Sequence, residues 1–193
     1  MSIKIIGGAF KNRGVKAPNT TLSKPTMSLM RKSVFDICQP YIQDAYFLDL
    51  FACSGAMGIE ALSRGGAYSV FVDKDRKAAQ CIKENINSFS LQKKSLILCL
   101  DAISALKKLE ELQMKFHIVY LDPPYTHIDD ITSPAKLLPY LDTSPLLEEG
   151  AVVLVEEAYP GHLNLGQLSL QKTRWKNSRK FSSSLLHQFI YTA

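Results

Sequence analysis

The chain has 193 residues, the length of one ordinary domain, so a second independent module would have to be very small. Its composition, 46% hydrophobic and 21% charged, is close to the globular average and excludes a mainly disordered, collagen-like or coiled-coil protein. No apolar run reaches the roughly 18–20 residues that span a bilayer, and the first residues lack a signal-peptide pattern, so we expect a cytoplasmic protein.

The net charge of +5 is unevenly distributed along the chain. Residues 1–44 carry +5 and residues 160–193 another +5, whereas residues 45–159 carry −5. Basic segments around an acidic middle suit an enzyme core flanked by contacts to a polyanion, because each neutralised phosphate releases counterions. Solvated basic surfaces without a partner are the alternative.

We divide the chain into a basic N-terminal extension over 1–44, with a small hairpin and a helix, and a main domain over 45–193. Apolar residues recur at helical spacing within 26–38, which predicts the helix and places Arg31 and Lys32 on or near its solvent side. The polar stretch 17–24 is the one evident linker.

The main domain alternates apolar, β-branched runs with helical patterns, which indicates a parallel sheet with helices on both faces. The expected strands are 45–51, 68–73, 95–100, 116–121 and 151–156. Helices are expected over 58–64 and 75–89. Two further strand-like pieces, 168–175 and 185–191, would form a closing antiparallel hairpin around a basic turn at 176–183.

The four cysteines and four histidines show no spacing typical of a metal site or a disulfide framework. We therefore expect buried free thiols and no metal.

A run of small residues follows the first strand of the main domain and opens a helix: Ala52, Ser54, Gly55 and Gly58. In a doubly wound sheet this turn lies at the carboxyl end of the first strand, where a ligand approaches the backbone closely. Cys53 stands where the dinucleotide fingerprint GxGxxG would have its first glycine. The turn therefore predicts a small-molecule pocket, although not a dinucleotide site.

Acidic residues stand near the ends of three successive strands, at Asp49, Asp73 and Asp101. The Asp73 carboxylate can accept two hydrogen bonds from a ribose diol. The three acids together favour a cationic or hydroxyl-rich nucleoside over a dinucleotide, whose pyrophosphate they would repel. Each acid taken singly is equally compatible with a helix N-cap or a turn.

The fourth strand ends in Asp122, Pro123, Pro124 and Tyr125. An exocyclic amine of a nucleobase is a poor nucleophile, and two hydrogen-bond acceptors on its N–H groups favour the reactive sp³ form. The Asp122 carboxylate and the Pro123 carbonyl can supply them, while the two prolines stiffen the loop. Tyr125 offers a ring on which an unpaired or flipped base can stack.

At this point the sequence resembles the class I S-adenosylmethionine-dependent methyltransferases, through FACSGAMG and DPPY. The ordered segments IKIIGGAFKNRGV, KPTMSLMRKSVFDI, FLDLFACSGAMGIEALSRGGAYSVFVDKD and VYLDPPY more closely resemble the bacterial RsmD family. That resemblance implies a Rossmann-like class I methyltransferase domain over 45–193, with a seven-stranded, mainly parallel sheet, one C-terminal antiparallel strand and helices on both faces.

The resemblance also implies roles for individual residues. Residues 122–125 would hold the target amine as the catalytic group. The cofactor S-adenosylmethionine would be held by Asp49, Phe51, Ala52, Cys53, Ser54, Gly55, Gly58, Asp73, Lys74, Asp101, Ala102 and Thr26. RNA would be bound by Lys11, Arg13, Lys16, Lys24, Arg31, Arg179 and Lys180.

Two positions depart from the family pattern. Cys53 replaces the glycine of FAGSG, which reduces backbone freedom in the cofactor loop, and Lys24 replaces an arginine, which loses bidentate phosphate geometry. Neither change removes a reacting group.

The implied reaction is a direct methyl transfer to guanine N2 of 16S ribosomal RNA, with S-adenosylhomocysteine as product and without a metal. The implied partner is that RNA within the small ribosomal subunit or its assembly intermediate, and we expect a monomer. An adenine-N6 methyltransferase acting on DNA or RNA stays open, because DPPY fits both amines. A non-catalytic nucleoside- or nucleic-acid-binding Rossmann protein is the alternative from another functional class.

Overall fold

A computed structural model describes the chain at residues 2–18, 28–123, 133–158, 163, 170–181 and 183–192. Its central sheet contains β3 (Tyr46–Asp49), β4 (Tyr68–Val72), β5 (Ser95–Leu98), β6 (Phe116–Leu121), β7 (Leu147–Ala158), β8 (Thr173–Lys180) and β9 (Ser184–Tyr191). The predicted Lys24, Thr26, Pro124 and Tyr125 sites lie outside the described residues.

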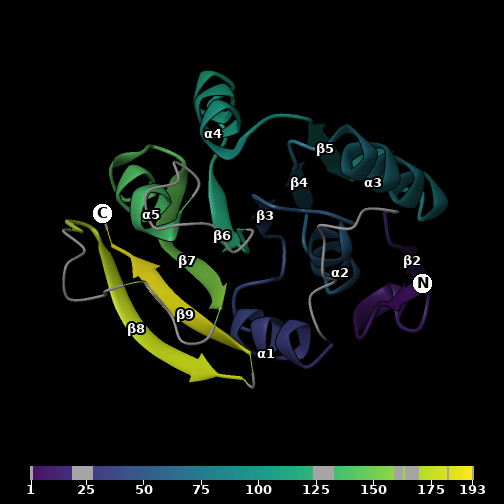
Figure 1. Ribbon diagram of the computed structural model, residues 1–193, viewed down its shortest axis with the longest axis horizontal. Helices are drawn as coiled ribbons and strands as arrows, with labels where there is room; N and C mark the ends of the chain where they lie inside the picture. The colour runs from purple at the N-terminus through teal and green to yellow at the C-terminus, as the bar shows by residue number, and fades with distance from the viewer. Residues whose placement is uncertain are drawn as a thin grey trace.

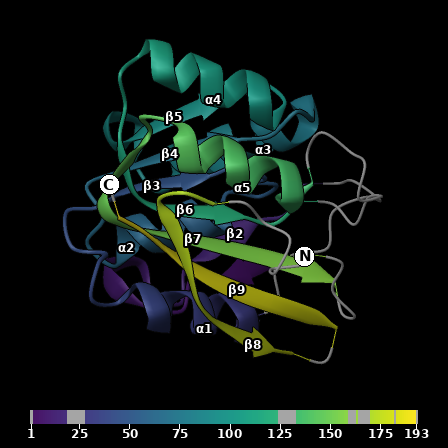
Figure 2. The ribbon, with the colours of Figure 1, turned by 90° about the vertical axis from the view of Figure 1, so that its left-hand side faces the viewer.

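The strand order is β5-β4-β3-β6-β7-β9-β8, and β9 alone runs opposite to the other strands of this sheet (Figure 2). The chain first builds outward from β3 to β5 and then returns to place β6 on the other side of β3. The carboxyl ends of β3 and β6 therefore form the topological switch point, where ligands bind in open α/β sheets. The predicted Rossmann-like sheet with one antiparallel strand is confirmed.

Alternating side chains of the strands meet helices on both faces of the sheet. On one face, α4 (Ala102–Glu111) and α5 (Pro134–Thr143) pack on residues such as Leu48 and Val119. The other face receives α1 (Ser28–Cys38), α2 (Ala56–Ser63) and α3 (Arg76–Ser88), as Figure 1 shows. Every strand of the sheet's centre is thus covered on both sides, which explains the near-continuous apolar runs in the sequence.

The N-terminal residues form a hairpin of β1 (Ser2–Lys4) and β2 (Gly14–Lys16), with a short 3-10 turn over Gly8–Phe10. The hairpin is attached to α2 by the buried Glu60 carboxylate, whose two oxygens accept the N–H groups of Ile6 and Gly7 at 2.7 Å each. A Cβ on Gly8 would lie 1.8 Å from the Ser63 carbonyl oxygen. Only glycine permits so close a contact between hairpin and helix.

Asn85 of α3 connects the hairpin to the turn after β3. Its side-chain amide donates to the carbonyls of Lys16 and Ser54 at 2.9 Å each and accepts the Lys16 N–H at 2.9 Å. The side chain is 1% exposed, so these hydrogen bonds are shielded from water. The hairpin and the turn therefore share one buried polar anchor.

Three expectations about the local structure are wrong. The four thiols are free but not all buried, because Cys53 is half-buried and Cys99 is exposed. Arg31 is 3% exposed and not near solvent, because the hairpin covers that face of α1 and the guanidinium donates to the Lys4 carbonyl at 2.9 Å. The basic stretch predicted as a turn over 176–183 is in strand β8 as far as Lys180. A bulge between Trp175 and Asn177 keeps it paired with β9, and charged side chains are tolerated because β8 is an edge strand.

Candidate active site

Four acidic residues lie at the carboxyl edge of neighbouring strands. Asp49 is the last residue of β3, Asp73 follows β4, Asp122 follows β6 and Glu156 is near the end of β7. Asp49 pairs with Phe71 of β4 and Tyr120 of β6, and Leu121 pairs with Val155 of β7, so the acids stand at one level of the sheet. The edge therefore gathers four carboxyl groups.

Asp49 is the most perturbed of these acids. Its carboxylate is 1% exposed, and neither oxygen has a hydrogen-bond partner among the described residues. The pKa of Asp49 is raised to about 8, first by burial and then by the charge of Asp73. The backbone N–H groups of Phe51 and Gly58 favour the charged form, but neither reaches hydrogen-bond geometry. A buried carboxylate in this state fits a cationic group of a ligand.

The turn after β3 is fixed against β4. The Cys53 N–H donates to an Asp73 carboxylate oxygen at 2.8 Å, and the Ala52 N–H donates to the Val72 carbonyl at 2.9 Å. Cys53 and Gly55 both have left-handed backbones, with φ of 50° and 77°. Cys53 therefore occupies a conformation that favours glycine.

Gly58 lets α2 approach the sheet. A Cβ at this position would lie 2.3 Å from a ring carbon of Phe71 and 2.4 Å from the Ser69 hydroxyl oxygen. This glycine is therefore explained by packing of the helix, and the structure places no ligand role on it by itself.

Asp73 and Asp101 also serve the local fold. The second Asp73 oxygen accepts the Asp75 N–H at 2.9 Å, and burial raises the pKa of Asp73. Asp101 is the exposed N-cap of α4, and its hydrogen bonds to Ser104 lower its pKa. Both carboxylates retain lone pairs for hydroxyl groups of a ligand, because each oxygen can accept more than one hydrogen bond. Of their neighbours named above, Lys74 is exposed and Ala102 is buried.

Tyr120 and Glu156 are site residues that the sequence analysis missed. The buried Tyr120 hydroxyl donates to a Glu156 carboxylate oxygen at 2.6 Å. The pKa of Tyr120 is well above its usual range because of burial and then the charges of Asp122 and Glu156. Asp122 itself is half-buried and is followed by the buried Pro123. The signal available in the sequence was Glu156 itself, the first acid after the apolar run of its strand.

The predicted RNA-binding residues fall on two separate flanks. Lys11, Arg13 and Lys16 are exposed on the hairpin, where the Arg13 guanidinium lies 4.1 Å from the ring centre of Phe89. Arg179 and Lys180 are exposed at the end of β8. Arg179 donates to the Ser33 hydroxyl of α1 at 3.0 Å, and Figure 1 shows α1 between the end of β8 and the hairpin.

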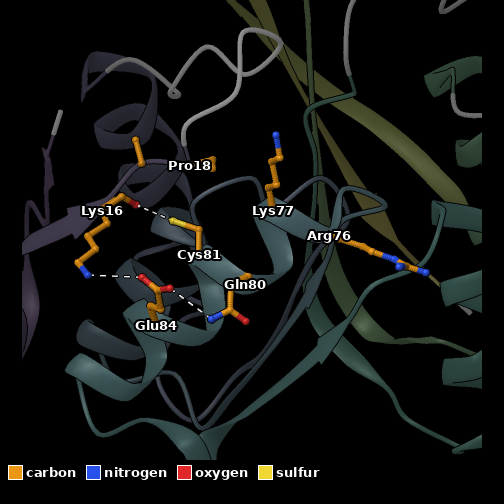
Figure 3. A pocket seen from close by; sticks show the side chains of 8 residues that line it. Lys16, Pro18, Arg76, Lys77, Gln80, Cys81 and Glu84 are labelled. Atoms are coloured by element: carbon orange, nitrogen blue, oxygen red, sulfur yellow. Dashed lines mark hydrogen bonds and ion pairs between the residues drawn. The ribbon is translucent and has the colours of Figure 1, made fainter.

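A cavity of about 390 Å³ lies between the end of β2 and the first turns of α3 (Figure 3). The side chains of Lys16, Arg76 and Lys77 contribute positive charge to its lining, and Lys16 forms an ion pair with Glu84 at 3.4 Å. The cavity lies beside α3. Its lining residues come from other elements than β6 and β7, which carry the acids near Asp122. No role follows from it alone.

Within the described part of the chain, no group of three or more His, Cys, Asp and Glu side chains is arranged to hold a metal ion. Across the same residues, the helices are too short or too polar to cross a membrane.

Comparison with known proteins gives consistent matches. A family model described as "Conserved hypothetical protein 95" matches residues 3–186. The chain is 36% identical over 154 residues to "Putative rRNA methyltransferase YlbH" of Bacillus subtilis, covering 80% of this chain and 82% of that protein. It is 32% identical over 123 residues to "Ribosomal RNA small subunit methyltransferase D" of Escherichia coli strain K12, covering 64% and 60% respectively.

Among solved structures, "Putative methyltransferase yhhF" from Escherichia coli superposes with a TM-score of 0.83 at 24% identity, covering 100% of this chain and 99% of that chain. At that identity the likeness concerns the fold.

Proposed function

Because the chain belongs to the RsmD family of class I methyltransferases, we propose that it transfers a methyl group from S-adenosylmethionine to guanine N2 of 16S ribosomal RNA. The observation that carries the proposal is the buried Asp49 carboxylate without a hydrogen-bond partner at the switch point. Similarity to rRNA methyltransferases supports the class of acceptor, and the choice of guanine N2 rests on the family resemblance.

The residues of the edge fit S-adenosylmethionine. The Asp49 carboxylate suits the α-ammonium of the methionine part, because a cation would satisfy oxygens that now lack partners. The Asp73 carboxylate, next in line on β4, suits the ribose hydroxyls. The turn over 52–55 brings backbone rather than bulky side chains to the ligand. When bound, the cofactor supplies an activated methyl group on a sulfonium, which is a good leaving group.

The protein's own part in the reaction is to hold and polarise the amine. Asp122 and the Pro123 carbonyl accept its two N–H groups, which directs the nitrogen lone pair at the methyl carbon. Positive charge develops on that nitrogen as the new N–C bond forms, and the Asp122 carboxylate stabilises it electrostatically. Asp122 then takes up the proton that the methylated amine loses.

Tyr120 helps to fix the strands that carry this site. Its hydroxyl is held by Glu156 at 2.6 Å, and its raised pKa keeps it neutral and able to donate. Burial also raises the pKa of Glu156. The pair fixes β6 to β7 directly beneath the loop that carries Asp122.

The remaining parts of the proposal concern the partner. The exposed cations of the hairpin and of β8 would bind phosphates of the RNA within the small subunit or its assembly intermediate, and the protein would act as a cytoplasmic monomer. The 1–44 extension would then serve RNA contact and 45–193 methyl transfer. Affinity for RNA should therefore fall steeply with salt.

The test compares wild type with Asp122→Asn, which keeps the shape of the side chain and removes its charge. We expect turnover to fall by about 10²–10⁴-fold, the usual contribution of proton transfer by a placed side chain. S-adenosylmethionine affinity, measured by calorimetry on the same samples, should change by less than a few fold. Normal turnover in the variant would remove Asp122 from the reaction.

A further inference from the structure

The outermost strand of the sheet exposes the protein's single tryptophan. Trp175 lies on β8 and is 52% exposed, more than any other aromatic side chain among the described residues. Edge strands are commonly protected by charged side chains, and β8 carries Arg174, Lys176, Arg179 and Lys180. That protection accounts for the cations but not for a large apolar ring, which invites aggregation at an edge.

A chain of hydrogen bonds holds the indole in place. The Trp175 Nε1–H donates to the Ser178 hydroxyl at 3.1 Å, Ser178 lies 2.6 Å from Nδ1 of His187, and Nε2 of His187 lies 2.8 Å from a Glu157 carboxylate oxygen. The indole is only a donor and the carboxylate only an acceptor, so the bonds run in one direction from ring to acid. His187 is 4% exposed. The exposed Trp175 ring on β8 is thus held through side chains of β8, β9 and β7.

The edge strand that carries the ring is rich in positive charge. Residues 160–193 contain five basic and no acidic residues, and four of the basic residues are on β8. The bulge between Trp175 and Asn177 puts Trp175, Ser178 and Lys180 opposite Phe189, His187 and Leu185, on one face of the sheet, whereas Arg174 and Arg179 lie on the other face. An exposed ring on a cationic strand suits single-stranded nucleic acid, with phosphates on the charges and a base on the ring.

We propose that Trp175 is a stacking platform for an unpaired base of the RNA substrate, outside the target nucleotide. The proposal rests on the proposed function. Leu121, Val155, His187 and Ser178 form one row across β6, β7, β9 and β8. Three strand spacings of about 4.8 Å put Ser178 roughly 14 Å from the strand end that carries Asp122, and Trp175 about three residues further back. At that distance the ring would contact a base several nucleotides from the target.

The single tryptophan makes the test direct, because its fluorescence reports one site. We would titrate wild type with a fluorescein-labelled 16S RNA fragment containing unpaired bases, following tryptophan emission and RNA anisotropy in the same cuvette. Stacking should quench the emission and reduce its accessibility to acrylamide over the range in which the anisotropy rises. Binding that leaves both unchanged would overturn the proposal.

Variants test the contribution to affinity. Trp175→Ala should weaken RNA binding by about 5- to 150-fold, the cost of losing one stacked base, whereas Trp175→Phe should keep most of the affinity. Ser178→Ala leaves the ring but removes its anchor, and should give an intermediate loss. The matched control is Tyr46→Ala, an exposed aromatic at the amino end of the central strand β3, which should bind RNA like wild type.

The outcomes separate this inference from the proposed function. Wild-type methylation of RNA together with unchanged RNA affinity in Trp175→Ala would refute the stacking platform and leave the methyltransferase intact. If Trp175→Ala lost binding to assembled small subunits but not to naked RNA, the stacking platform would also be refuted, because the ring would then contact a ribosomal protein. Absence of methyl transfer by wild type, with quenching still seen, would contradict the proposed function and keep the RNA site.

Discussion

Replacing Asp49 by asparagine tests the electrostatic account of the cofactor site. The carboxyl group has an ordinary pKa of 3.8 and a pKa of about 8 in the folded protein. Between those values the native state retains a proton that the unfolded chain loses, so stability falls as pH rises from about 4 to about 8 and levels off above that. The shift of about 4 pKa units, at about 1.36 kcal/mol each, amounts to about 6 kcal/mol above pH 8.

Asparagine has the same shape and does not ionise, so it removes this pH-dependent cost. Its buried amide lacks partners as well, which costs about 1–3 kcal/mol at every pH. The stability difference between Asp49→Asn and wild type should therefore move in favour of the variant by about 1.4 kcal/mol per pH unit between pH 5 and pH 7. At pH 7 the variant should be the more stable protein and should bind S-adenosylmethionine poorly.

The assay is urea unfolding of both ligand-free proteins at pH 5, 6 and 7, followed by calorimetric titration with S-adenosylmethionine. For wild type, cofactor affinity should rise with pH up to about 8, because the ammonium requires the ionised carboxylate. If the stability of the two proteins changed with pH in the same way, or if they bound the cofactor equally well, the electrostatic role of Asp49 would be refuted.

Two further predictions concern the turn after β3, which we propose as part of the cofactor site. Cys53→Gly should stabilise the protein by about 1 kcal/mol in urea unfolding, because Cys53 has a φ of 50°. Gly55→Ala, at a φ of 77°, should destabilise it. Stability changes of the same sign in the two variants would contradict the strain argument. Asn85→Ala should cost about 2–4 kcal/mol and lower cofactor affinity, since it breaks three buried hydrogen bonds to Lys16 and Ser54. Its control is Asn87→Ala at an exposed position of the same helix. Similarly small losses of stability in the two variants would refute the role of Asn85 as a buried anchor.

The strands of the parallel sheet were predictable because each is a short apolar run buried on both faces, and the turn after β3 because its small residues stand together. The course of 176–180 was not, since charged residues on an edge strand have the composition of a turn. Arg31 was misplaced because helical periodicity shows which face is apolar but not that a distant hairpin covers a basic side chain.

Other site residues depend on pairings between distant segments. Tyr120 and Glu156 meet only through the register of β6 and β7, and Asn85 looks like an ordinary surface residue of a helix until β2 packs against it. The acids at 49, 73 and 101 were predictable as a group, because parallel strands bring their carboxyl ends to one edge, and Asp122 was predictable from the motif that it opens. The partnerless state of the Asp49 carboxylate required the packed structure.

The most direct test of the central claim identifies the product. Wild-type protein would be incubated with methyl-labelled S-adenosylmethionine and either unmethylated small subunits, naked 16S RNA or duplex DNA, and the labelled nucleoside identified after digestion by chromatography and mass spectrometry. The account predicts N2-methylguanosine from a ribosomal acceptor, with none formed by Asp122→Asn. N6-methyladenine in any acceptor, or no label transferred although the cofactor binds, would contradict it.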